Sequence, residues 1–587
     1  MMNTMSSPQC AVRLSWVGHV LHGAIISMTL AAWAMPVRAQ ENPPTGFGCG
    51  IQNNNTGETL PAGAHGDPLF KIVTSQKFCP NNALEFRNLV KQLGLKLNPA
   101  MVADRGFNNP LPQGLFSFFE AVTGDYEGNK IEPGDWFFGH FQVAVNNNTA
   151  GTSVLQEQNQ GSDNALLLES VVWDPTIGMF RFYEIRGNGQ GGTWFYRGSS
   201  LDILDDIKNV WRNSNPGEPL FGRNPDLAKQ DQGGPRLRCS GCHMNGGPIM
   251  KELAFPHNMW WRKERPLPLG SLVIQPAIQG ILDDVVDASV FSKWIDDGYT
   301  KLFSSKRYMD ERGKLTLQEQ LRVIFCEQEV NLASDTTPLG DPNAKVVQAP
   351  VGFFVDPRLL PDGPKFVEIK KDLYVNALNH FQSQFFDVQS SDSIGIDADH
   401  GFSSPVKSHS DMLLAEAMVK AKIVDMEFVI DVLAVDMTRP MFSKERCNLL
   451  QLVPDRADDD WLEEFKGRLE ASSSPAAAEL LANLTDPKRD IAYHQKQAAA
   501  LVKTLQKNAE NQDIVTGWVR LLSQRRIEVF RSQISQHPQG QIFEPEFRLL
   551  FPTLNLLKAD QNESAYGGVP DQYWLNPETG TTELSAQ

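Results

Sequence analysis

Residues 134–145 read GDWFFGHFQVAV, a run of aromatic and β-branched side chains. Similar runs follow at 164–173 (NALLLESVVW), 178–185 (GMFRFYEI) and 193–198 (TWFYRG), separated by clusters of Gly and Asn. Short apolar runs bounded by turn residues are typical of antiparallel strands. The sequence therefore predicts a β-rich domain over residues 111–200.

The glycine-rich stretch 187–192 (GNGQGG) formally matches the dinucleotide fingerprint G-x-G-x-x-G. In that fingerprint the glycines open a helix. Here Thr193-Trp194-Phe195-Tyr196 follows and reads as a strand. We therefore interpret the match as a hairpin loop.

The flanking sequence is less regular on one side and helical on the other. Residues 40–110 are expected to form an irregular lead-in, polar and rich in Gly, Asn and Pro to residue 78, with a helix from about Asn82 to Leu95. After residue 200 the spacing of apolar side chains predicts helices. We expect them at 315–332, 411–423, 425–435, 489–508 and 515–534, with a surface excursion over 333–365 and an irregular tail after 551. The predicted fold class is α+β and multidomain: the β-rich domain, a mainly helical domain over 201–471, and a helical C-terminal segment with its tail over 472–587.

The first 39 residues are expected to be a signal peptide and not part of the fold. Arg13 precedes a short apolar run at 24–35, and Val37-Arg38-Ala39 offers small residues for cleavage before Gln40. The apolar run is short for a membrane span, and no later stretch reaches about 18 apolar residues. We therefore expect no stable membrane span after cleavage, and a periplasmic or secreted protein; an uncleaved anchor is the alternative.

Composition sets further limits on function. The 587 residues carry a formal net charge of −16. Non-specific nucleic-acid binding needs a basic surface, so that class is excluded. Cysteine usage suits export, because Cys49, Cys79, Cys326 and Cys447 can pair in an oxidising compartment. We favour Cys49–Cys79 and Cys326–Cys447, with four separate thiols as the alternative.

The motif that carries chemistry is Cys239-Ser240-Gly241-Cys242-His243, that is, C-x-x-C-H. Two thiols at this spacing can each form a thioether with one of the two vinyl groups of a haem. The next residue then lies under the ring, where its imidazole can bind the iron.

At these residues the chain resembles the cytochrome c superfamily. The resemblance implies one covalent haem c, with Cys239 and Cys242 as its attachment points and His243 as the proximal iron ligand. It covers only the motif, and the chain is several times longer than a small cytochrome c. A zinc site, a thioredoxin-like redox pair and a structural disulfide within the motif are the rival interpretations.

The second axial ligand is left open by the sequence. Its candidates are Met250, His257, Met259, Met437 and Met441, or no protein ligand. Two axial ligands would suit electron transfer in the periplasm, with a redox partner protein. An open position would suit a haem-dependent oxidoreductase, a peroxidase or oxygenase acting on a small-molecule substrate. An acid–base histidine for that chemistry would come from His140, His257, His380, His400 or His409. A third hypothesis is a sensing module in which the β-rich part holds a ligand.

Overall fold

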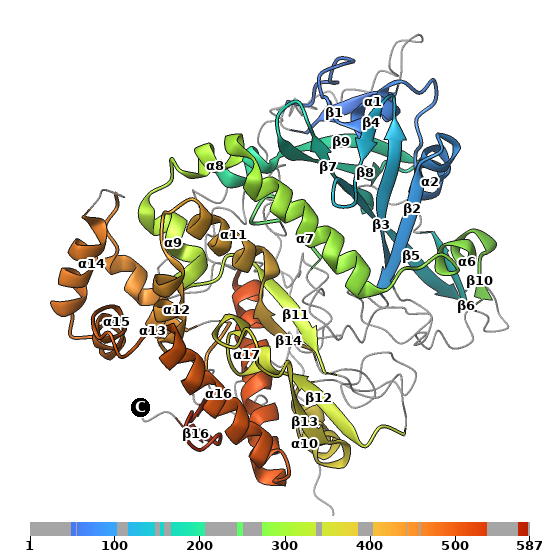
Figure 1. Cartoon of the computed structure of the whole chain (residues 1–587). Helices are drawn as coiled ribbons and strands as arrows, with labels where there is room; N and C mark the ends of the chain where they lie inside the picture. The colour runs from blue at the N-terminus through green and yellow to red at the C-terminus, as the bar shows by residue number, and fades with distance from the viewer. Residues whose placement is uncertain are drawn as a thin grey trace, which may run out of the picture. The chain divides into compact units, whose positions relative to one another are not determined.

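A mixed β-sheet forms the N-terminal half of the part of the chain that the structure describes (Figure 1). In this computed structural model the described residues are 49–54, 56–102, 115–146, 153–157, 166–205, 243–250, 273–335, 343–385, 403–441, 443–456, 460–536 and 573–584. The strands follow the order β1-β9-β8-β7-β5-β3-β2, while β4 pairs with β3, β6 with β5 and β10 with β6. All these pairs are antiparallel except β1 with β9 and β10 with β6. The strands are β1 (Ile51–Asn53), β2 (Lys96–Val102), β3 (Leu115–Tyr126), β4 (Asn129–Ile131), β5 (Trp136–Asn146), β6 (Ser153–Glu157), β7 (Leu166–Asp174), β8 (Met179–Gly187), β9 (Gly192–Ser199) and β10 (Val273–Ile274).

The central strand β5 is apolar on both faces because both faces are covered. Trp136 and Phe138 join a core with Phe86 of α2 (Ala83–Gln92), whose ring lies 6.0 and 5.4 Å from theirs, and helix α1 (Pro68–Thr74) packs into the same core. The intervening Phe137 points to the opposite face, where its ring lies 5.5 Å from that of Phe291 on α7 (Ala288–Ser304). A strand buried on both sides loses the alternation of apolar and polar residues.

Helices and two small antiparallel ladders make up most of the remaining described residues. The ladders are β11 (Val330–Ser334) with β14 (Ser403–Lys407) and β12 (Val346–Pro350) with β13 (Phe366–Lys370). The helices are α6 (Pro276–Leu282), α7, α8 (Lys306–Arg312), α9 (Leu317–Phe325), α10 (Lys371–Phe385), α11 (His409–Lys420), α12 (Met426–Ala434), α13 (Lys444–Asn448), α14 (Trp461–Glu470), α15 (Pro475–Thr485), α16 (Ile491–Asn508) and α17 (Gln512–Gln536), with short 3-10 turns η1 (Val351–Phe353), η2 (Pro357–Leu359) and η3 (Leu449–Leu452).

One hydrophobic core runs from the sheet into the C-terminal helices. It includes Phe137 and Phe180 from the sheet, Phe291 from α7 and Trp518 from α17, and the described residues belong to one compact unit. The α+β class is therefore confirmed. The boundaries near residues 200 and 471, and a cytochrome-like character for 201–471, stay predictions.

Several local expectations need correction. The helix expected over 315–332 ends at Phe325, because Cys326 turns extended and the Asp411 carboxylate accepts hydrogen bonds from the backbone N–H groups of Gln328 (2.8 Å) and Glu329 (3.2 Å). The stretch 333–365 is not a surface excursion throughout, since β12, η1 and η2 lie in it and bury Phe353, Phe354 and Leu359, among others.

Both stretches expected to be irregular contain regular elements among their described residues. The lead-in contains β1 and α1, and the tail contains a hairpin of β15 (Tyr573–Leu575) and β16 (Thr582–Leu584). Helices predicted at 82–95, 411–423, 425–435, 489–508 and 515–534 are present within a few residues as α2, α11, α12, α16 and α17. The glycines at 187–192 join β8 to β9, which confirms the hairpin loop.

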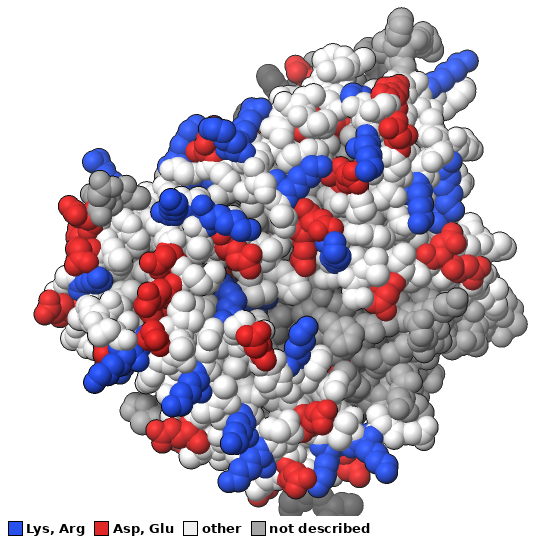
Figure 2. All heavy atoms as spheres, in the orientation of Figure 1, with Lys and Arg blue, Asp and Glu red and all other residues white. Residues whose placement is uncertain are grey.

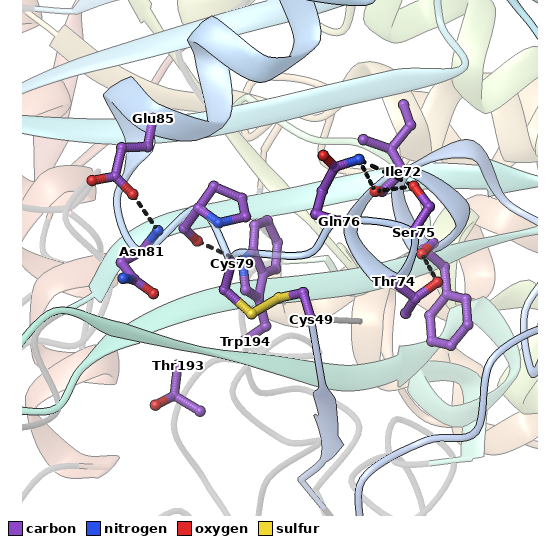
Figure 3. The surroundings of a disulfide bond; sticks show 12 residues. Cys49, Ile72, Thr74, Ser75, Gln76, Cys79, Asn81, Glu85, Thr193 and Trp194 are labelled. Carbon is purple, nitrogen blue, oxygen red and sulfur yellow. Dashed lines mark hydrogen bonds between the residues drawn. A yellow bond between two sulfur atoms is a disulfide. The ribbon is translucent and has the colours of Figure 1, made fainter. Parts of the chain in front are cut away.

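Both favoured cysteine pairs are bonded in the structure, which confirms the pairing predicted above. Cys49–Cys79 fastens the start of the described chain beside the sheet, near Trp194, whose indole N–H donates to the carbonyl of Pro80 at 2.9 Å (Figure 3). Cys326–Cys447 joins the end of α9 to α13 across 121 residues. Disulfides of this kind persist outside the reducing cytoplasm, so the bonded pairs are compatible with export.

The structure also bears on membrane and charge expectations. Among the residues that the structure describes, none of the helices has the length and apolar character that a membrane crossing requires. On the face seen in Figure 2, acidic and basic side chains are interspersed over the surface. Among the described residues on this face, neither sign of charge gathers into a single patch. The expected signal peptide lies outside the described residues.

Candidate functional site

The C-x-x-C-H motif lies at the edge of what the structure describes. Cys239 and Cys242 fall outside the described residues, whereas His243 and the seven residues after it are described. This segment, 243–250, passes between the sheet and the helices. Met244 and Met250 are buried in the hydrophobic core that the two share.

His243 is held from two sides. Its Nδ1 atom donates to the carbonyl oxygen of Gly247 at 2.8 Å, since a carbonyl can only accept. Its ring packs against Phe182 of β8, with the centroids 5.0 Å apart and the planes at 56°. A neutral imidazole that donates from Nδ1 carries its lone pair on Nε2. Metal-ligating histidines are typically held this way, with the second ring nitrogen bonded to a carbonyl or carboxylate, so His243 fits an axial iron ligand.

The turn after His243 depends on its two glycines. The backbone N–H of Gly246 donates to the His243 carbonyl at 2.8 Å, and its φ of +75° is in the left-handed region. A Cβ on Gly247 would stand 2.5 Å from a ring carbon of Tyr299 on α7. The chain therefore turns tightly directly after the motif.

Asn245, which is fully buried, fixes this turn to the helical part. Its side-chain Nδ2 donates to the Ser410 hydroxyl and the Asp411 carboxylate, both at 2.8 Å, and its Oδ1 accepts from Gln328 at 2.5 Å. Its backbone N–H donates to Glu329 at 2.6 Å, and its carbonyl accepts from the Tyr308 hydroxyl at 2.8 Å. Every hydrogen-bonding group of this residue is thus engaged.

Behind Asn245 lies a buried group of charges that the sequence analysis missed. Glu327, Lys407, Asp411 and Arg446 are each no more than 4% exposed. The Lys407 ammonium donates to the carbonyl of Cys326 and lies 3.7 Å from Asp411. Burial raises the pKa of Glu327 to about 7 and lowers the pKa of Lys407 to about 8; burial also raises the pKa of Asp411. Charged residues are seldom fully buried, and nothing in the sequence around these four indicates that they are.

The candidates for a second iron ligand are only partly described. His257 and Met259 lie outside the described residues. Met250 and Met441 are buried in the core, and Met437 packs against it. Core packing accounts for all three, and the second ligand stays open.

The candidate acid–base histidines have other roles where the structure describes them. His140 is fully buried on β5, bonded to Glu120 (3.1 Å) and Gln142 (3.1 Å), with Arg87 completing the group at 2.9 Å from Glu120. His380 is exposed, and His409 lies 3.4 Å from Asp296. His257 and His400 are outside the described residues. Neither His140 nor His409 is brought to His243 by these contacts.

Comparisons with known proteins add no relative. No family model, no curated protein and no solved structure matches the chain. Among the described residues, no three His, Cys, Asp or Glu side chains are grouped as a metal site would need. The function is therefore inferred from the motif and from the way the fold holds His243.

Proposed function

We propose that this protein is an exported monohaem c-type cytochrome that transfers electrons outside the cytoplasm. Haem, when bound, supplies one-electron chemistry at iron. Cys239 and Cys242 would attach it, and His243 would be its proximal ligand. The observation that carries the proposal is the hydrogen bond from His243 Nδ1 to Gly247, because it sets the tautomer that an iron ligand needs in the residue that completes C-x-x-C-H.

The surroundings of His243 support a rigid redox site. Phe182 presents an apolar ring to the imidazole, and the turn that carries it is anchored in buried hydrogen bonds. Electron transfer is fast when the structure changes little between the oxidised and reduced states. An imidazole whose orientation is already fixed would move little on reduction or oxidation. Both disulfides are compatible with the oxidising compartment in which c-type haem is attached.

The peroxidase or oxygenase alternative has less support. It needs an acid–base side chain beside an open iron position. The strongest candidate by burial, His140, is occupied by Glu120 and Gln142 within the sheet.

The test is spectroscopy on the full chain, produced with a cytochrome c maturation system. We expect a Soret band, and a low-spin spectrum that cyanide and peroxide do not change if the protein is an electron carrier. A high-spin spectrum that shifts on adding either reagent would favour the oxidoreductase. Absence of a Soret band would overturn both.

A further inference from the structure

We propose that Asn245 is a positioning residue for His243, which fixes the orientation of the imidazole from two residues away. This inference rests on the proposed function, because it concerns the iron ligand of that same site. The contacts that support it are all between residues of the chain and do not involve the haem.

Asn245 connects the turn after His243 to several parts of the fold. The five hydrogen bonds of Asn245 reach residues on three separate parts of the helical region: Tyr308 on α8, Gln328 and Glu329 before β11, and Ser410 and Asp411 on α11. The Gln328 side chain also donates to the carbonyl of Met244 at 3.1 Å, directly beside His243. The turn is thus fixed to the fold immediately after the ligand.

Asp411 accepts hydrogen bonds from the backbone of Gln328 and Glu329, and it also needs a donor on the side of residue 245. An amide supplies that donor and an acceptor for Gln328 at once, whereas an aspartate would place a second carboxylate against Asp411. A buried polar group left unpaired costs about 1–3 kcal/mol, so the site selects asparagine.

The hydrogen bonds of Asn245 and those that hold the His243 imidazole belong to the same short loop, residues 244–247. Gly246 carbonyl accepts from the Ser200 hydroxyl at 2.6 Å, and Gly247 carbonyl accepts from His243. Without the Asn245 side chain, residues 244–247 lose the three hydrogen bonds that tie them to Gln328, Ser410 and Asp411. The carbonyl that holds Nδ1 then moves.

The experiment compares three variants of the full chain made with a cytochrome c maturation system. Asn245→Ala removes the three hydrogen bonds of the side-chain amide and keeps the two that the backbone of residue 245 makes. Asn245→Leu keeps the approximate size of the side chain and removes the same three hydrogen bonds, which separates their loss from the creation of a cavity. Asn483→Ala is the matched control, since Asn483 is 5% exposed and bonds to the Asp431 carbonyl (3.1 Å) and Arg489 (3.0 Å), far along the chain from the motif.

The measurement is the pH at which acid detaches His243 from iron, read from the Soret band, with the haem content taken from the intact mass. Loss of a residue that orients a metal ligand costs about 10- to 100-fold in metal affinity, so we expect Asn245→Ala to keep one haem and to raise this pH midpoint by roughly one to two units. Asn245→Leu should raise the midpoint as Asn245→Ala does, because it lacks the same amide. Asn483→Ala should lose stability to denaturant and keep the wild-type midpoint.

An unchanged midpoint in Asn245→Ala, or an equal rise in Asn483→Ala, would overturn the inference and leave the proposed function standing. If Asn245→Ala does not fold, Ser410→Ala removes one of the five bonds, and a smaller rise of the midpoint would support the inference, whereas no rise would overturn it. A wild-type chain without haem would overturn the proposed function and this inference together.

Discussion

The imidazole of His243 packs on the ring of Phe182, with centroids 5.0 Å apart, and this contact joins the motif to strand β8 of the sheet. Phe180 lies on the same face of that strand, two residues earlier, and packs instead against Trp173 at 5.1 Å. The two phenylalanines are therefore a matched pair for comparison, because Phe182 contacts the His243 imidazole and Phe180 packs on Trp173.

Substituting each ring by leucine distinguishes an effect on core packing from an effect on the orientation of the His243 imidazole. We expect Phe182→Leu and Phe180→Leu each to destabilise the fold by about 1–2 kcal/mol. Only Phe182→Leu should also shift the reduction potential and the Soret band. Denaturant unfolding measures the loss of stability, and a redox titration measures the reduction potential. An equal shift of the reduction potential in both variants would contradict the prediction.

A methyl group at Gly247 should disturb the carbonyl that holds His243. The added Cβ would stand 2.5 Å from the Tyr299 ring, so the turn must shift. We expect Gly247→Ala to lose stability by about 1–3 kcal/mol and to alter the haem spectrum. Gly280→Ala on α6 is the control, since a Cβ there meets nothing within 4 Å. Thermal unfolding and absorption spectra of the two variants test this, and a Gly247→Ala chain that behaves like the control would argue against the turn's role.

The two disulfides should differ in what they contribute to stability. Cys326–Cys447 closes a loop across 121 residues, and Cys49–Cys79 one across 30. A cross-link that closes a longer loop removes more entropy from the unfolded chain, about 5 against 4 kcal/mol for these lengths. Replacing each pair by serines should therefore lower the midpoint of chemical denaturation more for Cys326–Cys447. The reverse order would show that strain or residual structure outweighs loop entropy.

Glu327 should make stability depend on pH. Burial raises its pKa from 4.5 to about 7, with Lys407, Arg322 and Arg446 opposing the rise and Asp411 adding to it. A carboxyl whose pKa is raised on folding contributes stability that is fully present below pH 4.5 and is lost as the pH rises through 7.

Relative to Glu327→Gln, we expect the wild type to lose ~3 kcal/mol between about pH 4.5 and 8. The difference between the wild type and this variant isolates the contribution of Glu327 to stability from that of Lys407. The pKa of Lys407 is lowered to about 8, so its contribution has the opposite trend and is lost as the pH falls. Denaturant titrations at several pH values measure this, with the exposed Glu463→Gln as control. A constant difference across that range would mean that Glu327 does not titrate there.

The sheet could be predicted because its signal is local. Aromatic and β-branched runs such as Trp136-Phe137-Phe138 specify strands whose faces are covered on both sides. The number of cysteines and the expected compartment predicted that the four cysteines outside the motif form disulfides, although they allowed three pairings. The C-x-x-C-H motif is itself contiguous.

What the sequence did not reveal depends on distant partners. Asn245 bonds to Asp411, 166 residues later, and neither position has a signal of its own. Glu327, Gln328 and Glu329 fall within the helix expected over 315–332. In the structure they follow the end of that helix and are buried, and the backbone N–H groups of Gln328 and Glu329 donate to Asp411. Phe353 and Phe354 lie in a Pro- and Asp-rich stretch that composition alone assigns to the surface.

Intact mass spectrometry of the mature chain, made alongside a variant with Cys239 and Cys242 both changed to alanine, tests the central claim most directly. The account predicts that the wild type carries the added mass of one haem together with a Soret band, and that the double variant carries no covalent haem. A wild-type chain with the mass of polypeptide alone, despite a working attachment system, would contradict it.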